Sequence, residues 1–539
     1  MFTDRHLPFD TAHRAMLLSN GRYTVMLTTA GSGFSRWGES AVTRWREDPT
    51  CDGWGSYVML RDCTSGAVWS ACRQPFGGSE QANAATLGEG HAEFVRHDDA
   101  LMTTMEVAVA SDRDAELRRV TIANHGSVAR DIALTSFAEL VLGTAAADAA
   151  HPAFSKLFVE TEALQDRRNL LATRRRRSPD EPELWAAHCA MVDGDAGDAF
   201  EFETDRARFI GRGRTLRNAQ AMQEGRALSN VAGAVLDPVF SLRLRVSVAA
   251  HASVRVCFWT AAASSREAAI ALCESARTPG ADDKALAGTL VQGQPPGDSP
   301  GRLLGSLLYA DSTWRSPPQV LARGNGGAPV LWAAGISGDC PIVSIGVTGK
   351  SGLATVDRWL AAQLHWQSQR FAVDLVLRNE AAGDADSLQS TLEARATAQR
   401  GRFAAGNDVT HAGVFVLRGD AMSRALRDGL ATAARIVLDA SADAADSTAP
   451  PTADAADPTV SAAPDATVSP AADASVPPAA DATVPVAADA TVPAAADTTV
   501  PAAADGARAP AALTSSVSAV SRGRAFAPPP SAREAAAPP

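Results

Sequence analysis

Apolar and polar residues alternate one by one along much of residues 16–263. The clearest run is 101–109, where Leu101, Met105 and Val109 share one side of the chain. The same period of two recurs in five other segments: 120–122, 132–134, 185–191, 242–248 and 254–258. A period of two with one polar face predicts antiparallel strands that are each buried on one side. Many such strands in succession predict a β-sandwich.

The pattern changes at residue 264. Ser264 with Glu267 three residues later has the form of a capping box, which predicts a helix from there to about Ala276. Residues 278–301 are rich in Gly, Pro and Asp, and this composition predicts a linker.

Residues 302–438 mix helical and strand-like segments. The apolar run 342–347, the amphipathic segment 353–366 and the apolar run 372–377 together predict one strand–helix–strand unit. The other segments are predicted helices at 302–310, 317–323, 387–400 and 421–438, and a strand at 414–417. We therefore predict a smaller α/β region after the sandwich.

From about residue 439 the sequence is repetitive. Ala-Thr-Val units recur at 466–468, 482–484 and 490–492, among many Ala and Pro residues and few large apolar ones. Such a composition cannot bury a core, so we predict disorder. The predicted organisation is a leader at 1–15, a carbohydrate-binding sandwich at 16–263, a helix and linker at 264–301, an α/β accessory region at 302–438 and a disordered tail at 439–539.

Composition excludes some classes of protein. The net charge of −11 over 539 residues argues against a nucleic-acid partner, because phosphate binding needs a basic surface. The seven cysteines form no Cys-x-x-Cys pair, so we expect free thiols in a reducing compartment and neither a metal nor a cofactor. With no secretory h-region and no membrane-spanning run, we expect a cytoplasmic chain.

One stretch, 17–62, concentrates aromatic and charged residues. It holds three of the ten Trp and two of the three Tyr residues. A pyranose offers an apolar face to an aromatic ring and hydroxyls to charged groups, so this mixture favours a carbohydrate site. The alternative is ordinary core packing and surface ion pairs. The candidate stacking residues are Trp45, Trp54 and Tyr57, and the candidate hydroxyl partners are Arg44, Asp48, Asp52 and Arg61.

Several segments, in this order, resemble the supersandwich domain of glycoside hydrolase family 94, formerly glycosyltransferase family 36. The likeness is closest to the first such domain of cyclic β-1,2-glucan synthases. The resemblance extends over about the first four-fifths of the chain. The matching segments are LLSNGRYTVMLTTAGSGFSRW (17–37), AVTRWREDPTCDGWGSY (41–57), HPAFSKLFVETE (151–162), LLATRRRRSPDEPELWAAH (170–188), FETDRARFIGRGR (202–214), LSNVAGAVLDPVFSLR (228–243) and LWAAGISGDCPIV (331–343). The resemblance implies a mainly β fold, a large antiparallel two-sheet supersandwich similar to galactose-mutarotase-like folds.

The resemblance also implies where catalysis takes place. In this family an (α/α)₆ barrel downstream of the sandwich supplies the general acid and the phosphate site. No segment here resembles that barrel, so we assign no catalytic residue. We expect a carbohydrate-binding accessory module whose partners are a glucan and either a catalytic domain or a second copy. The alternative is an active glycosyltransferase or glycoside phosphorylase acting on β-linked glucans. Full-length relatives are membrane-associated.

Two weaker signals have ordinary explanations. The segment 335–339 presents Asp339 beside two glycines, and a turn is the favoured interpretation. The basic run Arg174–Arg177 precedes Glu181 and Glu183, so a solvated or internally paired loop is favoured over a nucleic-acid contact.

Overall fold

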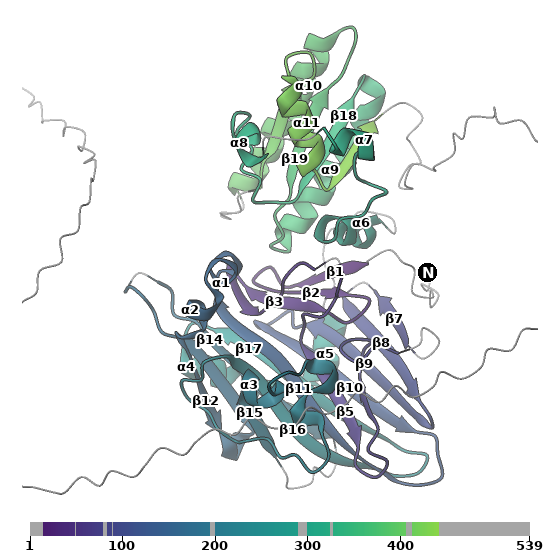
Figure 1. Cartoon of the computed structure of the whole chain (residues 1–539), viewed down its shortest axis with the longest axis vertical. Helices are drawn as coiled ribbons and strands as arrows, with labels where there is room; N and C mark the ends of the chain where they lie inside the picture. The colour runs from purple at the N-terminus through teal and green to yellow at the C-terminus, as the bar shows by residue number, and fades with distance from the viewer. Residues whose placement is uncertain are drawn as a thin grey trace, which may run out of the picture. The chain divides into compact units, whose positions relative to one another are not determined.

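The computed structural model describes residues 14–48, 50–78, 83–88, 90–179, 181–193, 200–288, 299–323, 327–405 and 412–440. All of them belong to one compact unit (Figure 1). The predicted leader at 1–15 lies outside these residues except for Arg14 and Ala15. The predicted disordered tail lies outside them except for Asp439 and Ala440.

The sandwich consists of two antiparallel sheets. The nine-stranded sheet has the order β1-β2-β3-β4-β11-β16-β15, with β5 also paired to β11 and β6 to β5. Its strands are β1 (Ala15–Ser19), β2 (Tyr23–Thr28), β3 (Gly33–Trp37), β4 (Ser40–Thr43), β5 (Tyr57–Asp62), β6 (Val68–Ser70), β11 (Arg130–Gly143), β15 (Glu201–Asp205) and β16 (Pro238–Val248).

The facing sheet has eight strands in the order β12-β13-β14-β17-β10-β9-β8-β7. They are β7 (Asn83–Leu87), β8 (His91–Asp98), β9 (Leu101–Val109), β10 (Ala115–Asn124), β12 (Val159–Leu164), β13 (Asn169–Arg174), β14 (Trp185–Asp193) and β17 (Ser253–Ala263). Val120 of β10 lies opposite Met105 and Val256 on its two neighbours, and all three are buried in the core between the sheets. The predicted apolar face of 185–191 instead lies on the outer side of its sheet, where Ala187 and Cys189 cluster with Trp259. The predicted mainly β sandwich is confirmed.

Five short helices lie within the described part of the sandwich region: α1 (Ala145–Ala150), α2 (Pro152–Lys156), α3 (Arg206–Ile210), α4 (Arg266–Ala276) and α5 (Ala281–Gly288). Helix α4 packs Ala269 and Cys273 against Trp259 on the outer face of the eight-stranded sheet. Its cap is Ser265, whose hydroxyl accepts the Ala268 N–H, so the predicted capping box at Ser264 is wrong by one residue.

The predicted linker at 278–301 is also wrong over part of its length, because it contains α5. Ala281 and Ala285 of this helix are buried against the outer face of the sheet. Alanine strongly favours a helix. Burial of these two small side chains against the sheet stabilises the helix although Asp residues stand between them.

Residues 342–440 build a four-stranded parallel sheet of order β20-β19-β18-β21. Its strands are β18 (Ile342–Val347), β19 (Asp374–Asn379), β20 (Val414–Arg418) and β21 (Ile436–Ala440). The helices of the region are α6 (Ser299–Leu308), α7 (Pro318–Leu321), α8 (Gly327–Trp332), α9 (Leu353–Ser368), α10 (Ala385–Ala405) and α11 (Arg424–Ala433). The predicted strand–helix–strand unit is β18-α9-β19, with its two strands parallel.

The predicted helix at 421–438 is wrong at its C-terminal end. Helix α11 stops at Ala433, and Ile436–Ala440 form β21 beside β18. Ala434 is the C-cap in an extended conformation, and Ile436 is buried against the parallel sheet. Pairing with β18 therefore overrode the helical periodicity that the chain shows up to Leu438.

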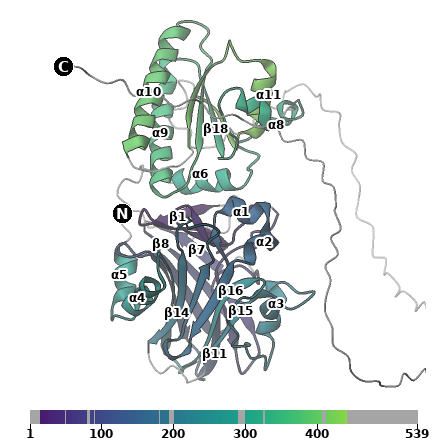
Figure 2. The ribbon, with the colours of Figure 1, turned by 90° about the vertical axis from the view of Figure 1, so that its left-hand side faces the viewer.

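The α/β region packs on β1, β2 and β3, at one end of the nine-stranded sheet. Leu17, Met26 and Phe34 share a hydrophobic cluster with α6 and α9, and Figures 1 and 2 show α6 beside β1. Hydrogen bonds join the same surfaces: Thr24 Oγ1 donates to the Gln369 carbonyl at 3.1 Å, and Arg370 Nε donates to the Gly21 carbonyl at 2.9 Å. Strand β2 is therefore buried on both faces. Within the described ranges, no helix is long and apolar enough to cross a membrane.

Candidate functional site

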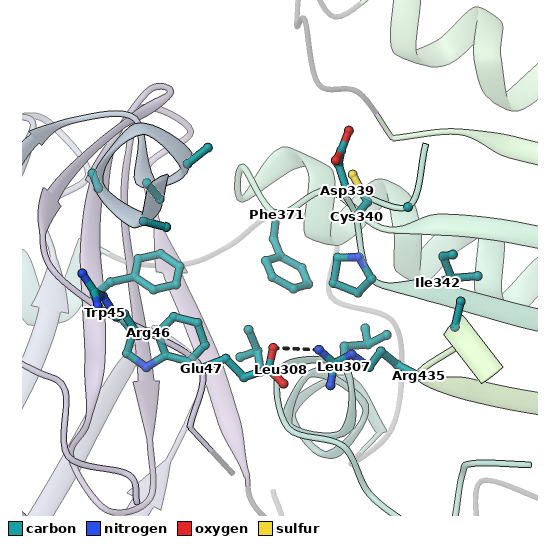
Figure 3. A pocket seen from close by; sticks show the side chains of 18 of the residues that line it. Trp45, Arg46, Glu47, Leu307, Leu308, Asp339, Cys340, Ile342, Phe371 and Arg435 are labelled. Carbon is teal, nitrogen blue, oxygen red and sulfur yellow. Dashed lines mark hydrogen bonds and ion pairs between the residues drawn. The ribbon is translucent and has the colours of Figure 1, made fainter. Parts of the chain in front are cut away.

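A cavity of about 860 Å³ lies where the sandwich meets the α/β region. One wall comes from β3, β4, the segment after β4 and helix α1. The other comes from α6, α8, α11, the segment before β18 and the residues preceding β19 and β21. Figure 3 shows Trp45, Arg46 and Glu47 on one side of the cavity and Asp339, Cys340 and Ile342 on the other. The cavity therefore lies at the amino ends of the parallel strands, opposite the edge where doubly wound sheets usually bind ligands.

Strand alternation positions the sandwich wall. Ser35 points into the sandwich core, where its hydroxyl donates to Glu116 Oε2 at 2.7 Å. Its neighbours Phe34 and Arg36 therefore point to the opposite face and line the cavity. After β4, the Arg44 N–H donates to the Glu139 carbonyl at 2.9 Å, which carries the chain along β11 and sets Trp45 at the cavity.

Aromatic rings form the apolar part of the lining. The ring of Trp45 meets Tyr309 edge-on with centroids 6.1 Å apart, and its centroid lies 5.9 Å from that of Phe34. Phe371 enters from the α/β side (Figure 3). These contacts hold the indole in one orientation and present aromatic surface to the cavity, which is the surface that a sugar ring stacks on.

An ion pair spans the two walls. Glu47 Oε2 accepts from Arg435 Nη2 at 2.7 Å, drawn as the dashed line in Figure 3. Arg46 places its guanidinium 5.5 Å from the centroid of the Trp54 ring, and one of its nitrogens lies 3.8 Å from Asp148. The rim of the cavity is therefore polar, while its lining is largely apolar.

Arg44 lies beneath the cavity wall and does not reach the cavity. Only 3% of it is exposed, and it donates to both carboxylate oxygens of Asp148 at 2.9 and 2.8 Å and to Glu139 at 2.9 Å. Burial opposes the charged guanidinium, but the bonds to Asp148 and Glu139 raise the pKa of Arg44. Arg44 ties α1 to β11 and is not available to sugar hydroxyls in this structure.

Three other predicted residues lie around the cavity without lining it. Asp52 accepts from Thr28 Oγ1 at 2.6 Å and from the Tyr309 hydroxyl at 2.7 Å, so it fastens the segment after β4 to the end of α6. Trp54 lies under Arg46. Asp48 is half-buried and accepts both the N–H and the hydroxyl of Thr50, within a turn. The hydrogen bonds to Thr50 lower the pKa of Asp48.

The structure places the last two predicted residues away from the cavity. Tyr57 is 1% exposed and packs in the sandwich core, with its hydroxyl 3.3 Å from Ser32 Oγ. Arg61, at the other end of β5, donates to the Met222 carbonyl at 2.8 Å and lies 3.7 Å from Glu224. Of the seven predicted residues, Trp45 alone lines the cavity among the described residues.

Sequence reasoning missed most of the lining. Phe34 and Arg36 stand in the same stretch as Trp45, and their spacing of two in a strand places them on one face. Phe371 and Arg435 come from residues more than three hundred positions later, and no local signal joins them to β3. Asp339, assigned above to a turn, lines the cavity as well. In the described part of the chain, no group of three or more His, Cys, Asp and Glu residues is placed to hold a metal ion.

Residues 3–279 match the family model for the glycosyl hydrolase 94 supersandwich domain. The chain is 35% identical over 444 residues to the cyclic beta-(1,2)-glucan synthase NdvB of Rhizobium meliloti (strain 1021). That match covers 80% of this chain and 16% of the synthase, so the chain spans less than a fifth of its relative's length.

Solved structures resemble the fold more distantly. A bacterial glucoamylase complexed with acarbose is 8% identical, with a TM-score of 0.31, over 58% of this chain and 42% of its own. A provisionally assigned aldose 1-epimerase of Escherichia coli K12 is 7% identical, with a TM-score of 0.28, over 47% of this chain and 100% of its own. The family match and the identity to the synthase decide the assignment: this chain belongs to the glycosyl hydrolase 94 supersandwich family.

Proposed function

We propose that this chain is a carbohydrate-binding accessory module of the kind that works with a cyclic β-1,2-glucan synthase, and that it is not catalytic by itself. The observation that carries the proposal is the cavity of about 860 Å³, lined by Phe34, Trp45 and Phe371, in a member of this family. Its volume lies in the range of small-molecule sites, and aromatic rings with a polar rim suit a short stretch of glucan.

The ion pairs of the cavity support a binding role rather than glycoside hydrolysis. Hydrolysis by acid–base chemistry takes two carboxyl groups facing the bond, whereas phosphorolysis takes one acid and a bound phosphate. Three carboxylates line the cavity among the described residues: Glu47, Asp148 and Asp339. Glu47 is paired with Arg435 and Asp148 with Arg44, which leaves Asp339.

The proposed ligand class comes from the relative, whose name specifies a cyclic β-(1,2)-glucan. On this proposal the sandwich at 16–263 and the α/β region at 302–438 act as one binding unit, because each contributes one wall of the cavity. A catalytic domain or a second copy of the chain would be the partner. A cytoplasmic location is part of the same proposal. It is supported by the seven cysteines, which all lie in the described residues as free thiols.

The test is a calorimetric titration of the purified chain with β-1,2-linked glucose oligosaccharides. We expect binding, and we expect Trp45→Ala to weaken it at least about tenfold, because the aromatic stacking surface is lost. Phe154→Ala is the matched control. It removes an aromatic ring on α2 that is 54% exposed and does not line the cavity.

Two results would contradict the proposal. The first is no binding to wild type at millimolar oligosaccharide. The second is release of glucose 1-phosphate when the chain is incubated with these oligosaccharides and inorganic phosphate, since the module would then be an enzyme.

A further inference from the structure

We propose that the Arg36 end of the cavity is an anion subsite, and that the preferred ligand is a hexose or short glycan carrying a phosphate or carboxylate group. The inference rests on the proposed function for the sugar part of the ligand. It goes beyond that function by adding a charged substituent and naming the residue that binds it.

Arg36 differs from the other arginines around the cavity because it has no carboxylate partner. Arg44 is paired with Asp148 and Glu139, Arg435 with Glu47, and Arg46 lies 3.8 Å from Asp148. Within the described residues, no carboxylate lies within ion-pair distance of Arg36. Its Nη1 donates a hydrogen bond to the Arg370 carbonyl at 3.3 Å. A guanidinium has five N–H donors, so most of this donor set remains for a ligand.

The surroundings of Arg36 disfavour a guanidinium charge that has no counter-charge. The guanidinium carbon lies 5.1 Å from the centroid of the Phe34 ring, within a largely apolar lining. Burial lowers the pKa of Arg36, and the charge of the exposed Glu39 only partly offsets this. A partly desolvated cation without a counter-charge binds an oxyanion more strongly than a neutral hydroxyl. The reason is that charge-assisted, bidentate hydrogen bonds are stronger than neutral ones.

The neighbouring rings define how such a ligand would lie. The Phe34 ring lies 5.9 Å from the Trp45 ring and 5.1 Å from the Arg36 guanidinium carbon, and all three side chains line the cavity. A sugar ring on Trp45 and Phe34 therefore brings a substituent one side chain further to Arg36. The carboxylate of Asp339 comes from the opposite wall of the cavity.

The experiment compares four probes by calorimetry on the full chain: a neutral β-1,2-linked glucose trisaccharide, glucose, glucose 6-phosphate and glucuronic acid. We expect at least one of the charged hexoses to bind about tenfold or more tightly than glucose, with the difference shrinking as salt rises. The tighter of the two identifies the anion as phosphate or carboxylate.

Variants assign the effect to Arg36. Arg36→Gln should abolish the preference for the charged hexose over glucose, and it should weaken the charged hexose about tenfold more than the neutral trisaccharide. Arg36→Lys keeps the positive charge but loses the bidentate hydrogen-bonding geometry of the guanidinium. It should therefore retain part of the preference for the charged hexose. Arg245→Gln is the matched control. It neutralises an exposed arginine on β16 that does not line the cavity, and it should change neither affinity.

Equal affinity of wild type for glucose and both charged hexoses would overturn the anion subsite. So would an equal loss of neutral and charged ligands in a folded Arg36→Gln chain, since Arg36 would then be structural. Failure of the glucan proposal has a different signature: charged hexoses bind in an Arg36-dependent way, and the neutral trisaccharide does not. That outcome supports the subsite while removing the neutral glucan as ligand.

Discussion

Arg44, Trp45 and Arg46 are consecutive residues with three different environments. Arg44 is buried in ion pairs, Trp45 presents its ring to the cavity, and Arg46 lies at the cavity rim with its side chain 41% exposed over Trp54. Each step along an extended chain turns the side chain to the other face, so neighbours in sequence separate in space. At this scale a cluster of suitable residue types does not define a site, because direction and burial select among them.

Asp374, the first residue of β19, is a buried carboxyl with incomplete hydrogen bonding. It is 0% exposed. One oxygen accepts the Gly413 N–H at 2.8 Å, and the other has no hydrogen-bond partner in the described residues. Burial, with a smaller contribution from the charge of Asp339, raises the pKa of Asp374 from 3.8 to about 6. The folded chain therefore holds this proton more tightly than the unfolded chain does.

We expect Asp374→Asn to stabilise the protein at pH 7.5 by about 2 kcal/mol, because the amide carries no charge to desolvate. The stability that protonated Asp374 contributes is complete below about pH 4 and is lost as the pH rises through 6. The stability gained from Asp374→Asn should therefore disappear at pH 4. Urea unfolding of both chains at the two pH values measures this. A gain of the same size at both would show that ionisation is not its source.

Helix α1 illustrates how an element is attached through one buried side chain. The helix has six residues and is too short to be stable alone. Its Asp148 is 4% exposed and receives two hydrogen bonds from Arg44, which also bonds Glu139 of β11. The position of α1, and with it one side of the cavity, therefore depends on this ion-pair network.

Arg44→Ala should lower the free energy of unfolding by about 3 kcal/mol, since Asp148 loses the guanidinium that is hydrogen-bonded to it and Glu139 keeps only Arg206. Arg46→Ala is the comparison, and because that side chain is exposed, we expect a loss of less than about 1 kcal/mol. Urea unfolding followed by tryptophan fluorescence gives both values. Similar small losses would mean that solvent reaches Asp148 and Glu139.

At the scale of the whole unit, the sandwich and the α/β region share a core. Leu17, Met26 and Phe34 are each less than 10% exposed because α6 and the parallel sheet cover them. β2 is buried on both faces, and its sequence, Tyr-Thr-Val-Met-Leu-Thr, is rich in apolar residues and does not alternate strictly. The two regions therefore stabilise one another, and the cavity between them depends on both.

A chain ending at residue 288 should expose this edge of the sandwich. We expect it to bind a hydrophobic dye and to lose about 5 kcal/mol of stability, from the apolar area of three large side chains. A chain ending at residue 440 retains both regions and serves as the control, with stability like that of the full protein. Equal stability of the two truncated chains would show that the sandwich does not need the α/β region.

The sequence by itself determined the elements whose signals are local. Strict alternation predicted β9, β10, β14, β16 and β17, and a strand–helix–strand rhythm predicted β18-α9-β19, because side-chain direction repeats with the backbone period. Its ordered motifs also determined the family, which the family model confirms over residues 3–279.

Tertiary structure decided what depends on contacts between distant segments. Residues 436–438 continue a helical pattern, yet they form β21 because β18 offers an open edge. Tyr57 and Arg61 have the residue types of a sugar site, yet strand register turns one into the core and pairs the other with a distant loop. Phe371 and Arg435 join Trp45 only after the α/β region docks on β1–β3, because a local sequence can show that a surface is buried but not which distant segment covers it.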